Sequence, residues 1–261
     1  MATSNEIQPA RLRKCRRIPP VLTPPFLVAL LAVAWPAVAR AQVEPAEPVG
    51  PPPQLLLFHG GSFLFEDPSF EPLIEPLVEA AGFVPHYVEY PLGNVPAAVA
   101  SARAEAARLR AKFGADDVYA YGSSAGGTLA ALLAGDGLVA AAVAKAPASD
   151  LVGWTWPLDR YGEDYYESIG LTTEARYRLS PLRRPERRPL LLLQGRADAV
   201  VPLSMSAAFA AKFRQVRLWM IAGGHQAERA HPQVVDRALT WLLRVTGAIK
   251  PRKGAGGGHG T

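Results

Sequence analysis

The sequence has almost no cysteine, and the position of its single cysteine excludes several kinds of chemistry. Among 261 residues only Cys15 is a cysteine, and it lies upstream of the apolar run that starts at Phe26. If that region is a cleaved leader, the remaining chain has no disulfide framework, no cysteine nucleophile and no thiolate metal site. Its stability must then come from an ordinary hydrophobic core, which a chain of this length can supply.

A surplus of positive charge is also absent from most of the chain. The sequence holds 28 Lys and Arg and 23 Asp and Glu, of which six basic residues and one acidic residue precede Gln42. Subtracting these from the totals leaves 22 of each sign, so the rest of the chain is formally neutral. The body therefore lacks the surplus of basic residues that binds phosphates, and we expect no nucleic-acid partner.

The basic N-terminal segment leads into an apolar run, Phe26–Ala39, which is followed by Ala-Arg-Ala at 39–41. This order is typical of a secretory signal peptide cleaved after Ala41. The run is short for a bilayer crossing and contains Pro36. We therefore expect residues 1–41 to be a signal peptide and the protein to be secreted or periplasmic. The alternatives are an uncleaved anchor, which would be the only expected membrane contact, and a start codon assigned too far upstream.

The composition divides the remaining chain into three parts. Residues 42–53 are rich in proline and predict an extended spacer. Residues 54–247 alternate apolar runs with helical periods and predict one domain, in which a cap insertion spans about 151–188. Residues 248–261 form a polar, glycine-rich tail that we expect to be disordered.

The pattern within the domain predicts an α/β fold. Strands are expected at 55–58, 84–89, 118–121, 139–144, 190–193 and 216–221, and helices at 95–113, 128–134, 203–213 and 232–245. Asn94 and Gly114 are the expected ends of the first helix. Continuous apolar strands are covered on both faces, and helices between them make right-handed parallel crossovers. The prediction is a doubly wound, mostly parallel sheet of about six strands, whose ligands bind beyond the carboxyl ends of the strands.

A Gly-Ser-Ser-Ala-Gly motif at 122–126 stands between a predicted strand and a predicted helix. This context favours the G-x-S-x-G elbow, in which the central serine adopts a positive φ at a tight turn. The residues two before and two after that serine must be small. Ser124 meets this requirement, because Gly122 stands two residues before it and Gly126 two residues after it. Ser123 has the bulky Tyr121 two residues before it and is therefore the weaker candidate.

A serine nucleophile needs a base, and the base needs an orienting acid. Of five histidines, His225 alone follows a strand end and precedes a helix. The other four belong to a turn, a strand, a helix start and the tail: His59, His86, His231 and His259.

The acid is expected at Asp198, which follows the strand at 190–193 and lies between Ser124 and His225 in the chain. That order, Ser, Asp, His, is the one found with the elbow motif. Asp150, after the strand at 139–144, is the competing candidate and is interpreted as a loop cap.

A tetrahedral intermediate of acyl transfer also needs N–H donors for its oxyanion. The amide after the nucleophile, that of Ala125, is one candidate. The HGGSF stretch at 59–63 follows the first predicted strand, and its glycines allow the amides of Gly61 and Ser62 to face the same site. A tight turn with no catalytic role would also explain the glycines. It would not explain why they occur together with a G-x-S-x-G motif in the same chain.

Together, HGGSF, GSSAGG, GRAD and GGHQ resemble the α/β-hydrolase superfamily, and within it the esterase/lipase branch similar to hormone-sensitive lipase and small acetyl esterases. That branch usually has HGGG and GDSAGG, so both motifs depart from its pattern. The resemblance covers about 54–245, and we expect no room between the leader and Gln54 for the family's first two strands.

Aromatic residues gather in the predicted cap, at Trp154, Trp156 and Tyr161 among others. They line a substrate pocket or form the cap's own core, and both readings stay open. Four arginines in the same insertion are interpreted as a solvated run rather than an anion site: Arg183, Arg184, Arg187 and Arg188.

The resulting expectation is a secreted serine hydrolase that cleaves carboxylic esters of small or medium size. Ser124, His225 and Asp198 act as nucleophile, base and orienting acid through an acyl-enzyme. The expected partner is a small-molecule ester, and no metal or organic cofactor is required. The alternatives are a serine peptidase similar to prolyl oligopeptidase and a catalytically silent binding protein on a hydrolase fold.

Overall fold

The computed structural model describes residues 51–249 of the chain. The predicted signal peptide, most of the spacer and most of the glycine-rich tail lie outside the described residues.

The described residues form one six-stranded sheet in which every neighbouring pair is parallel. The strands are β1 (Gln54–Phe58), β2 (Val84–Tyr87), β3 (Val118–Ser123), β4 (Ala142–Lys145), β5 (Leu190–Gly195) and β6 (Val216–Ile221), in the spatial order β2-β1-β3-β4-β5-β6. Every residue of the four inner strands is buried, because helices cover both faces. The predicted doubly wound sheet of about six strands is confirmed.

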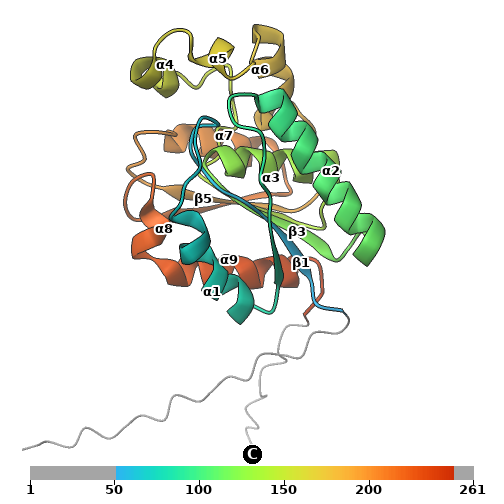
Figure 1. The fold of residues 1–261 in the computed structure, drawn as a ribbon. Helices are drawn as coiled ribbons and strands as arrows, with labels where there is room; N and C mark the ends of the chain where they lie inside the picture. The colour runs from blue at the N-terminus through green and yellow to red at the C-terminus, as the bar shows by residue number, and fades with distance from the viewer. Residues whose placement is uncertain (1–50, 250–261) are drawn as a thin grey trace, which may run out of the picture. The chain divides into compact units, whose positions relative to one another are not determined.

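Nine α-helices lie within the described residues. They are α1 (Phe70–Ala80), α2 (Val95–Phe113), α3 (Ala125–Asp136), α4 (Trp156–Tyr161), α5 (Tyr165–Ser168), α6 (Thr173–Leu179), α7 (Leu203–Lys212), α8 (Ala227–Ala230) and α9 (Pro232–Val245). A 3₁₀ turn follows α6 at Pro181–Arg183. Figure 1 shows α1 and α9 on one face of the sheet and α2, α3 and α7 on the other.

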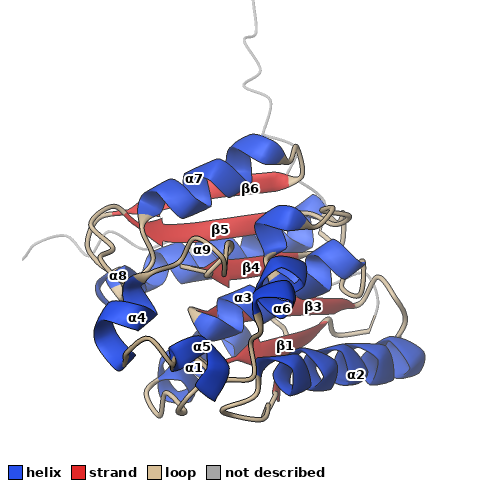
Figure 2. Ribbon diagram, turned by 90° about the horizontal axis from the view of Figure 1, so that it is seen from above, coloured by secondary structure: helices blue, strands red, loops and turns tan. Residues whose placement is uncertain are grey.

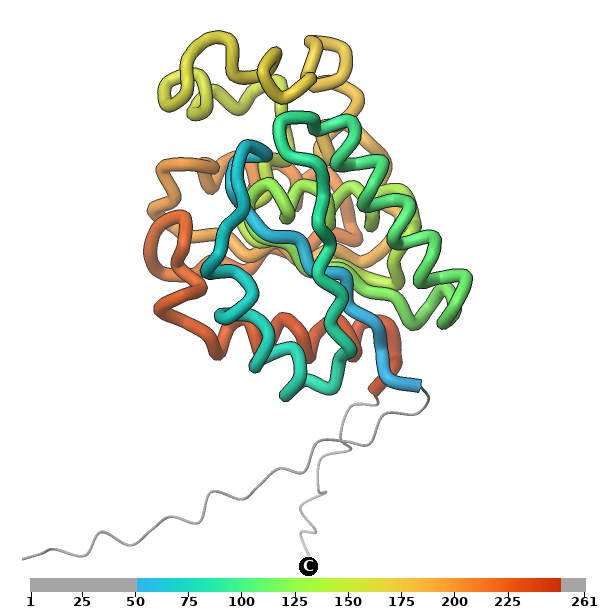
Figure 3. The backbone as a smooth tube through the Cα atoms, viewed as in Figure 1, coloured from blue at the N-terminus to red at the C-terminus, as the bar shows by residue number. Residues whose placement is uncertain are grey.

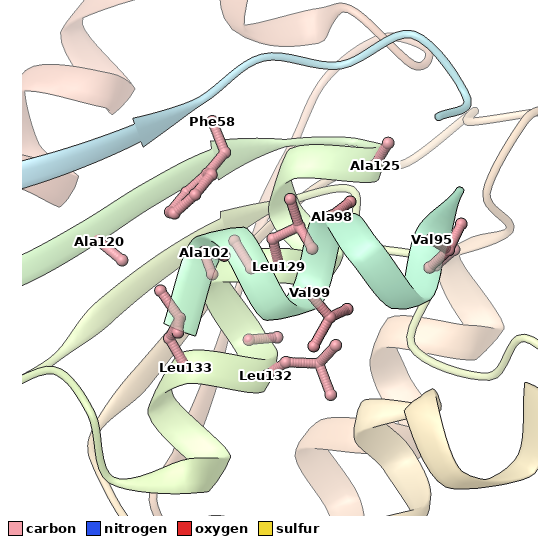
Figure 4. Close-up of a cluster of buried hydrophobic side chains, with 14 of the residues drawn as sticks. Phe58, Val95, Ala98, Val99, Ala102, Ala120, Ala125, Leu129, Leu132 and Leu133 are labelled. Carbon is pink, nitrogen blue, oxygen red and sulfur yellow. The ribbon is translucent and has the colours of Figure 1, made fainter. Parts of the chain in front are cut away.

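The ends of α2 agree with the prediction. The Asn94 side chain accepts a hydrogen bond from the Ala97 amide at 3.0 Å, and the helix ends at Gly114, whose φ is +108°. Small side chains bring α2 close to α3: Figure 4 shows Ala98 and Ala102 of α2 beside Leu129 of α3. This apolar layer holds α3, and hence its N-terminal turn, firmly against the sheet.

Several boundaries differ from the prediction: α3 begins three residues earlier, β2 ends two residues earlier, and β3 and β5 each end two residues later. Two further differences, at the end of α3 and the start of β4, have a physical reason. Helix α3 continues through Gly135 and ends at Gly137, whose φ is +76°. Gly135 is a packing residue, because a Cβ there would lie 3.0 Å from the Pro185 carbonyl. Strand β4 begins at Ala142 rather than at Val139, because its pairing with β3 and β5 starts only at Ala142.

Helix α1 was not predicted. Its buried residues, Phe70, Ile74 and Val78, recur every four residues, but Pro76 inside the helix obscures the signal.

The segment between β4 and β5 holds α4, α5, α6 and the 3₁₀ turn, and no strand. Figure 2 shows α4 and α8 both at the end of the sheet to which the strand arrows point, and Figure 1 shows that they lie apart from each other. In Figure 3 the turn after β1 extends toward the yellow segment that carries α4 and α5. Two hydrogen bonds join these parts: the hydroxyl of Tyr165 donates to the Ser62 carbonyl at 2.8 Å, and that of Tyr161 donates to the Ser62 Oγ at 3.4 Å. The insertion therefore lies at the carboxyl ends of the strands.

Glu186, in the stretch that returns from this segment to β5, carries a buried carboxyl group. Burial raises its pKa to about 8, although the backbone amides of Arg188 and Arg187 donate hydrogen bonds to it. In the unfolded chain the group titrates near its ordinary value of 4.5. The folded state therefore binds this proton more tightly than the unfolded chain does. The stability that the bound proton contributes is lost as the pH rises from about 4.5 to about 8.

Glu186→Gln should remove this pH dependence. We expect the variant to gain about 1–3 kcal/mol in free energy of unfolding, relative to the wild type, between pH 5 and pH 8. Urea unfolding of both proteins at the two pH values measures it. A difference between the proteins that does not change with pH contradicts the buried, protonated state.

Candidate active site

Ser124 occupies a sharp turn between β3 and α3. Its φ and ψ are +54° and −114°, a conformation that costs backbone energy in a residue other than glycine. Its amide donates to the Lys145 carbonyl of β4 at 2.7 Å, and its carbonyl accepts from the Thr128 amide at 3.0 Å. The turn that the motif predicted is thus present, and Ser124 stands at its apex.

The two glycines of the motif are required by close backbone contacts. A Cβ on Gly122 would lie 2.1 Å from the Gly126 carbonyl oxygen, and one on Gly126 would lie 2.2 Å from that of Phe58. Ser123, the weaker candidate, is the last residue of β3 and has an ordinary strand conformation.

Gly126→Ala should destabilise the protein by about 3 kcal/mol or more, because β1 and α3 cannot separate without disrupting the core. Gly224→Ala is the matched control, since a Cβ there meets nothing nearer than 3.5 Å and should cost less than about 1 kcal/mol. Urea unfolding compares the two variants. Equal stability of both would show that the elbow does not need the close approach.

The structure brings Ser124, His225 and Asp198 together from three strand ends. The Oγ of Ser124 lies 3.0 Å from the Nε2 of His225, and the Nδ1 of His225 lies 2.9 Å from the Oδ2 of Asp198. Because the carboxylate only accepts hydrogen bonds, the proton on the ring belongs to Nδ1. Nε2 is then free to accept the proton of the serine hydroxyl.

The side chain of Asp198 is fully buried, and three donors besides His225 hold its carboxylate. Its Oδ1 accepts from the amides of Val200 and Val201, both at 2.9 Å, and its Oδ2 accepts from the Nε2 of Gln194 at 2.7 Å. The Oε1 of Gln194 in turn accepts from the Ser206 hydroxyl at 2.7 Å.

Burial alone would raise the pKa of Asp198. The hydrogen bond and charge of His225, together with the amides of Val201 and Val200, outweigh burial and hold that pKa below its ordinary value. Asp198 is therefore ionised at neutral pH. Sequence reasoning missed Gln194 and Ser206, although Gln194 stands in the QGRAD stretch.

The remaining candidates lie away from this relay. Asp150 accepts from the Val152 amide at 3.2 Å and from the Nε of Arg183 at 3.1 Å, as a loop cap does. His86 bonds Gln54, His59 stacks on Tyr90, and His231 precedes α9 without a side-chain cap bond. His259 is outside the described residues.

The HGGSF turn places three consecutive residues at positive φ: Gly61 at +111°, Ser62 at +55° and Phe63 at +61°. It lies against the nucleophile, since a Cβ on Gly60 would come within 3.4 Å of the Ser124 Cβ. Within residues 51–249 the amides of Gly61, Ser62 and Ala125 donate no hydrogen bond. Their assignment as oxyanion donors stays a prediction that this arrangement supports.

A cavity of about 350 Å³ opens at Ser124 and His225. Its wall includes the HGGSF turn and side chains of mixed character: Phe65, Glu66, Asp67, Lys145, Trp156, Tyr161, Val200 and Glu228. Of the three aromatic candidates, Trp156 and Tyr161 line the cavity. Trp154 does not; it is buried, and its indole nitrogen donates to the Val200 carbonyl at 2.7 Å. Trp154 is thus part of the insertion's own core.

Residues 51–249 contain neither a cluster of metal ligands nor a membrane-spanning helix. No three His, Cys, Asp or Glu side chains in this part are grouped so that they can hold a metal ion. No helix in it is long and apolar enough to cross a bilayer.

The fold recurs in solved hydrolase structures. The acetyl ester-xyloside bifunctional hydrolase of Caldicellulosiruptor lactoaceticus superposes with a TM-score of 0.65 at 17% identity, covering 78% of this chain and 87% of that one. A thermophilic esterase of Thermogutta terrifontis gives 0.62 at 21% identity, covering 79% and 88%. An esterase/lipase from an uncultured bacterium gives 0.65 at 19% identity, covering 77% and 80%. At these identities the likeness shows the α/β-hydrolase fold.

The sequence itself matches a family model over residues 96–248, a range that contains Ser124, Asp198 and His225 but begins after the HGGSF turn. No curated protein sequence matches the chain. The family model covers more than half of the chain. The motifs predicted the α/β-hydrolase superfamily, and the structure has the α/β-hydrolase fold. The chain belongs to the prolyl oligopeptidase family.

Proposed function

We propose that the protein is a serine hydrolase that cleaves carboxylic esters with small or medium acyl and alcohol groups. The observation that carries the proposal is the unbroken relay from the Oγ of Ser124 through His225 to the buried Asp198. It stands beside a turn with free amides and opens into a cavity. These are the parts that acyl transfer requires.

In the proposed mechanism His225 removes the proton of Ser124 as the serine oxygen attacks the ester carbonyl. Asp198 keeps the ring in the Nδ1–H tautomer and stabilises the imidazolium that forms. The amides of Ala125, Gly61 and Ser62 donate to the oxyanion, and the imidazolium passes its proton to the departing alcohol. Water, activated by the same histidine, then releases the acyl group from Ser124.

The structural relatives support ester substrates. The thermophilic esterase of T. terrifontis is known with propionate and with butyrate bound, and in a form phosphorylated by paraoxon. A cavity of about 350 Å³ suits acyl groups of that size better than long chains.

Family membership favours a second candidate, a serine peptidase. The same relay can attack a peptide carbonyl, and the family model is that of the prolyl oligopeptidases. Against this candidate, Trp156 and Tyr161 of the insertion line a cavity of only about 350 Å³, which favours a small substrate.

Steady-state kinetics with p-nitrophenyl acetate, butyrate, octanoate and laurate, set beside prolyl and alanyl p-nitroanilides, separates the two candidates. We expect the highest kcat/KM at acetate or butyrate, and values for the anilides at least about 100-fold lower. If an anilide were cleaved faster than every ester, the protein would be a peptidase and not an esterase.

We also propose that the protein is exported, on the strength of the leader pattern in residues 1–41. N-terminal sequencing of protein from a secreting host should begin at Gln42. Recovery of the intact N-terminus in the cytoplasm would reject export.

A further inference from the structure

A buried ion pair stands beside the site and has no part in the mechanism above. The Nζ of Lys145 lies 2.9 Å from the Oε1 of Glu228, and the two side chains are only 4% and 6% exposed. Within the described residues the Oε2 of Glu228 is buried without a hydrogen-bond partner. Removing two charges from water is costly, and an unsatisfied oxygen adds to that cost, so stability alone does not explain the pair.

Lys145 is tied directly to the nucleophile. It is the last residue of β4, and its carbonyl accepts the hydrogen bond from the Ser124 amide at 2.7 Å. Helix α3 packs on the same carbonyl, since a Cβ on Gly127 would lie 2.8 Å from it. The backbone of Lys145 is therefore a fixed part of the elbow.

Glu228 is tied just as closely to the base. It belongs to α8 and follows His225 by three residues. The segment before it turns at Gly223, whose φ is +115°, and α8 has only four residues. Such a short, irregular segment needs contacts with the rest of the fold to keep His225 in place.

The next residue, Arg229, contacts the opposite side of the site. Its Nη2 donates to the Ser69 Oγ at 2.5 Å and to the Oδ2 of Asp67 at 3.3 Å. Both partners lie in the stretch between the HGGSF turn and α1. Arg229 is about one-third exposed, whereas Lys145 and Glu228 are buried, so the inner ion pair is the stronger restraint.

We propose that Lys145 and Glu228 are positioning residues, whose ion pair holds the His225 segment against the elbow and so maintains the contact between His225 and Ser124. Only the expected effect on ester kinetics rests on the proposed function. The structural consequence of the ion pair, the orientation of the His225 ring, is measurable whether or not the protein hydrolyses esters.

The test replaces the pair by apolar residues of similar size, Lys145→Met with Glu228→Leu, since this leaves no lone buried charge. Arg103→Met is the matched control; it removes the ion pair of α2 with Asp136, away from the site. Long-range ¹H–¹⁵N spectra of histidine-labelled protein at high pH report which ring nitrogen carries the proton, and His225→Gln assigns the signals.

We expect a single Nδ1–H tautomer of His225 in the wild type and in the control. In the double variant, folded by circular dichroism, we expect a mixture in which at least about a third of the rings carry the proton on Nε2, because the ring leaves Asp198. A single Nδ1–H tautomer in the folded double variant, or a mixture already in the wild type, overturns the proposal. If the double variant does not fold, Glu228→Asp, which keeps the charge but withdraws it by one methylene, should give a smaller shift in the same direction.

Ester kinetics provides the second readout. The double variant should lose at least about tenfold in kcat, since the chemical step needs the His225–Ser124 contact. Because both side chains also line the cavity, the positioning role is measured by kcat, and a change in KM with the wild-type kcat counts against it. The control should keep the wild-type kcat. A wild type that cleaves no ester and takes no fluorophosphonate rejects the proposed function, and the tautomer spectra still decide the positioning role.

Discussion

Replacing Ser124 by alanine should lower kcat/KM for a short-chain p-nitrophenyl ester by on the order of 10⁴-fold or more, because within residues 51–249 the hydroxyl of Ser124 is the one that hydrogen-bonds His225. The fold should persist. Serine and alanine meet the same backbone strain at a φ of +54°, and among the described residues the side-chain hydrogen bond lost is the one to His225. We expect the melting temperature to change by no more than about 4 °C.

Ser123→Ala is the matched control for this result. Ser123 carries the same hydroxyl one position earlier, on the last residue of β3, and makes no hydrogen bond with His225. It should keep activity within about tenfold of the wild type. If the losses of the two variants were reversed, the nucleophile would be Ser123 and the elbow would have been misassigned.

Replacing Asp198 by asparagine should lower kcat by about 10³- to 10⁴-fold. The Oδ2 of Asp198 faces two donors, His225 and Gln194, and its Oδ1 faces the amides of Val200 and Val201. The NH₂ group of an asparagine must therefore oppose two donors in either orientation. The ring of His225 then turns or changes tautomer and no longer accepts the serine proton.

Asp150→Asn is the control for loss of a carboxylate at a neighbouring strand end. Its carboxylate pairs with Arg183 outside the relay, so kcat should stay within about threefold of the wild type. A large kcat loss with Asp150→Asn and a small one with Asp198→Asn would mean that Asp150 is the orienting acid and Asp198 is not.

The sheet and the relay were predictable because their signals are local. Strands that are buried on both faces appear in the sequence as continuous apolar runs, and the elbow glycines stand in one short motif, although Gly126 is required by contact with the remote Phe58. The order of Ser124, Asp198 and His225 selected one aspartate and one histidine from several. The predicted end of α3 was wrong because a glycine needed for contact with Pro185 resembles a helix stop.

Other features depend on partners that are remote in sequence. Lys145 and Glu228 are 83 positions apart, and neither stands in a motif, so only the fold reveals their pairing. Trp154 and Trp156 are alternating aromatics in one segment, yet one is core and the other lines the cavity. Gln194 and Ser206 are ordinary residues until the burial of Asp198 gives them a role.

The most direct test of the central assignment is reaction of the leaderless protein with a fluorophosphonate probe, followed by peptide mapping of the adduct. The proposed relay predicts one adduct, on Ser124, whose formation is slowed in Asp198→Asn and absent in Ser124→Ala. Folded wild-type protein that takes no probe, or takes it on another residue, would mean that the turn at 122–126 serves packing alone and that the chain is a binding protein on a hydrolase fold.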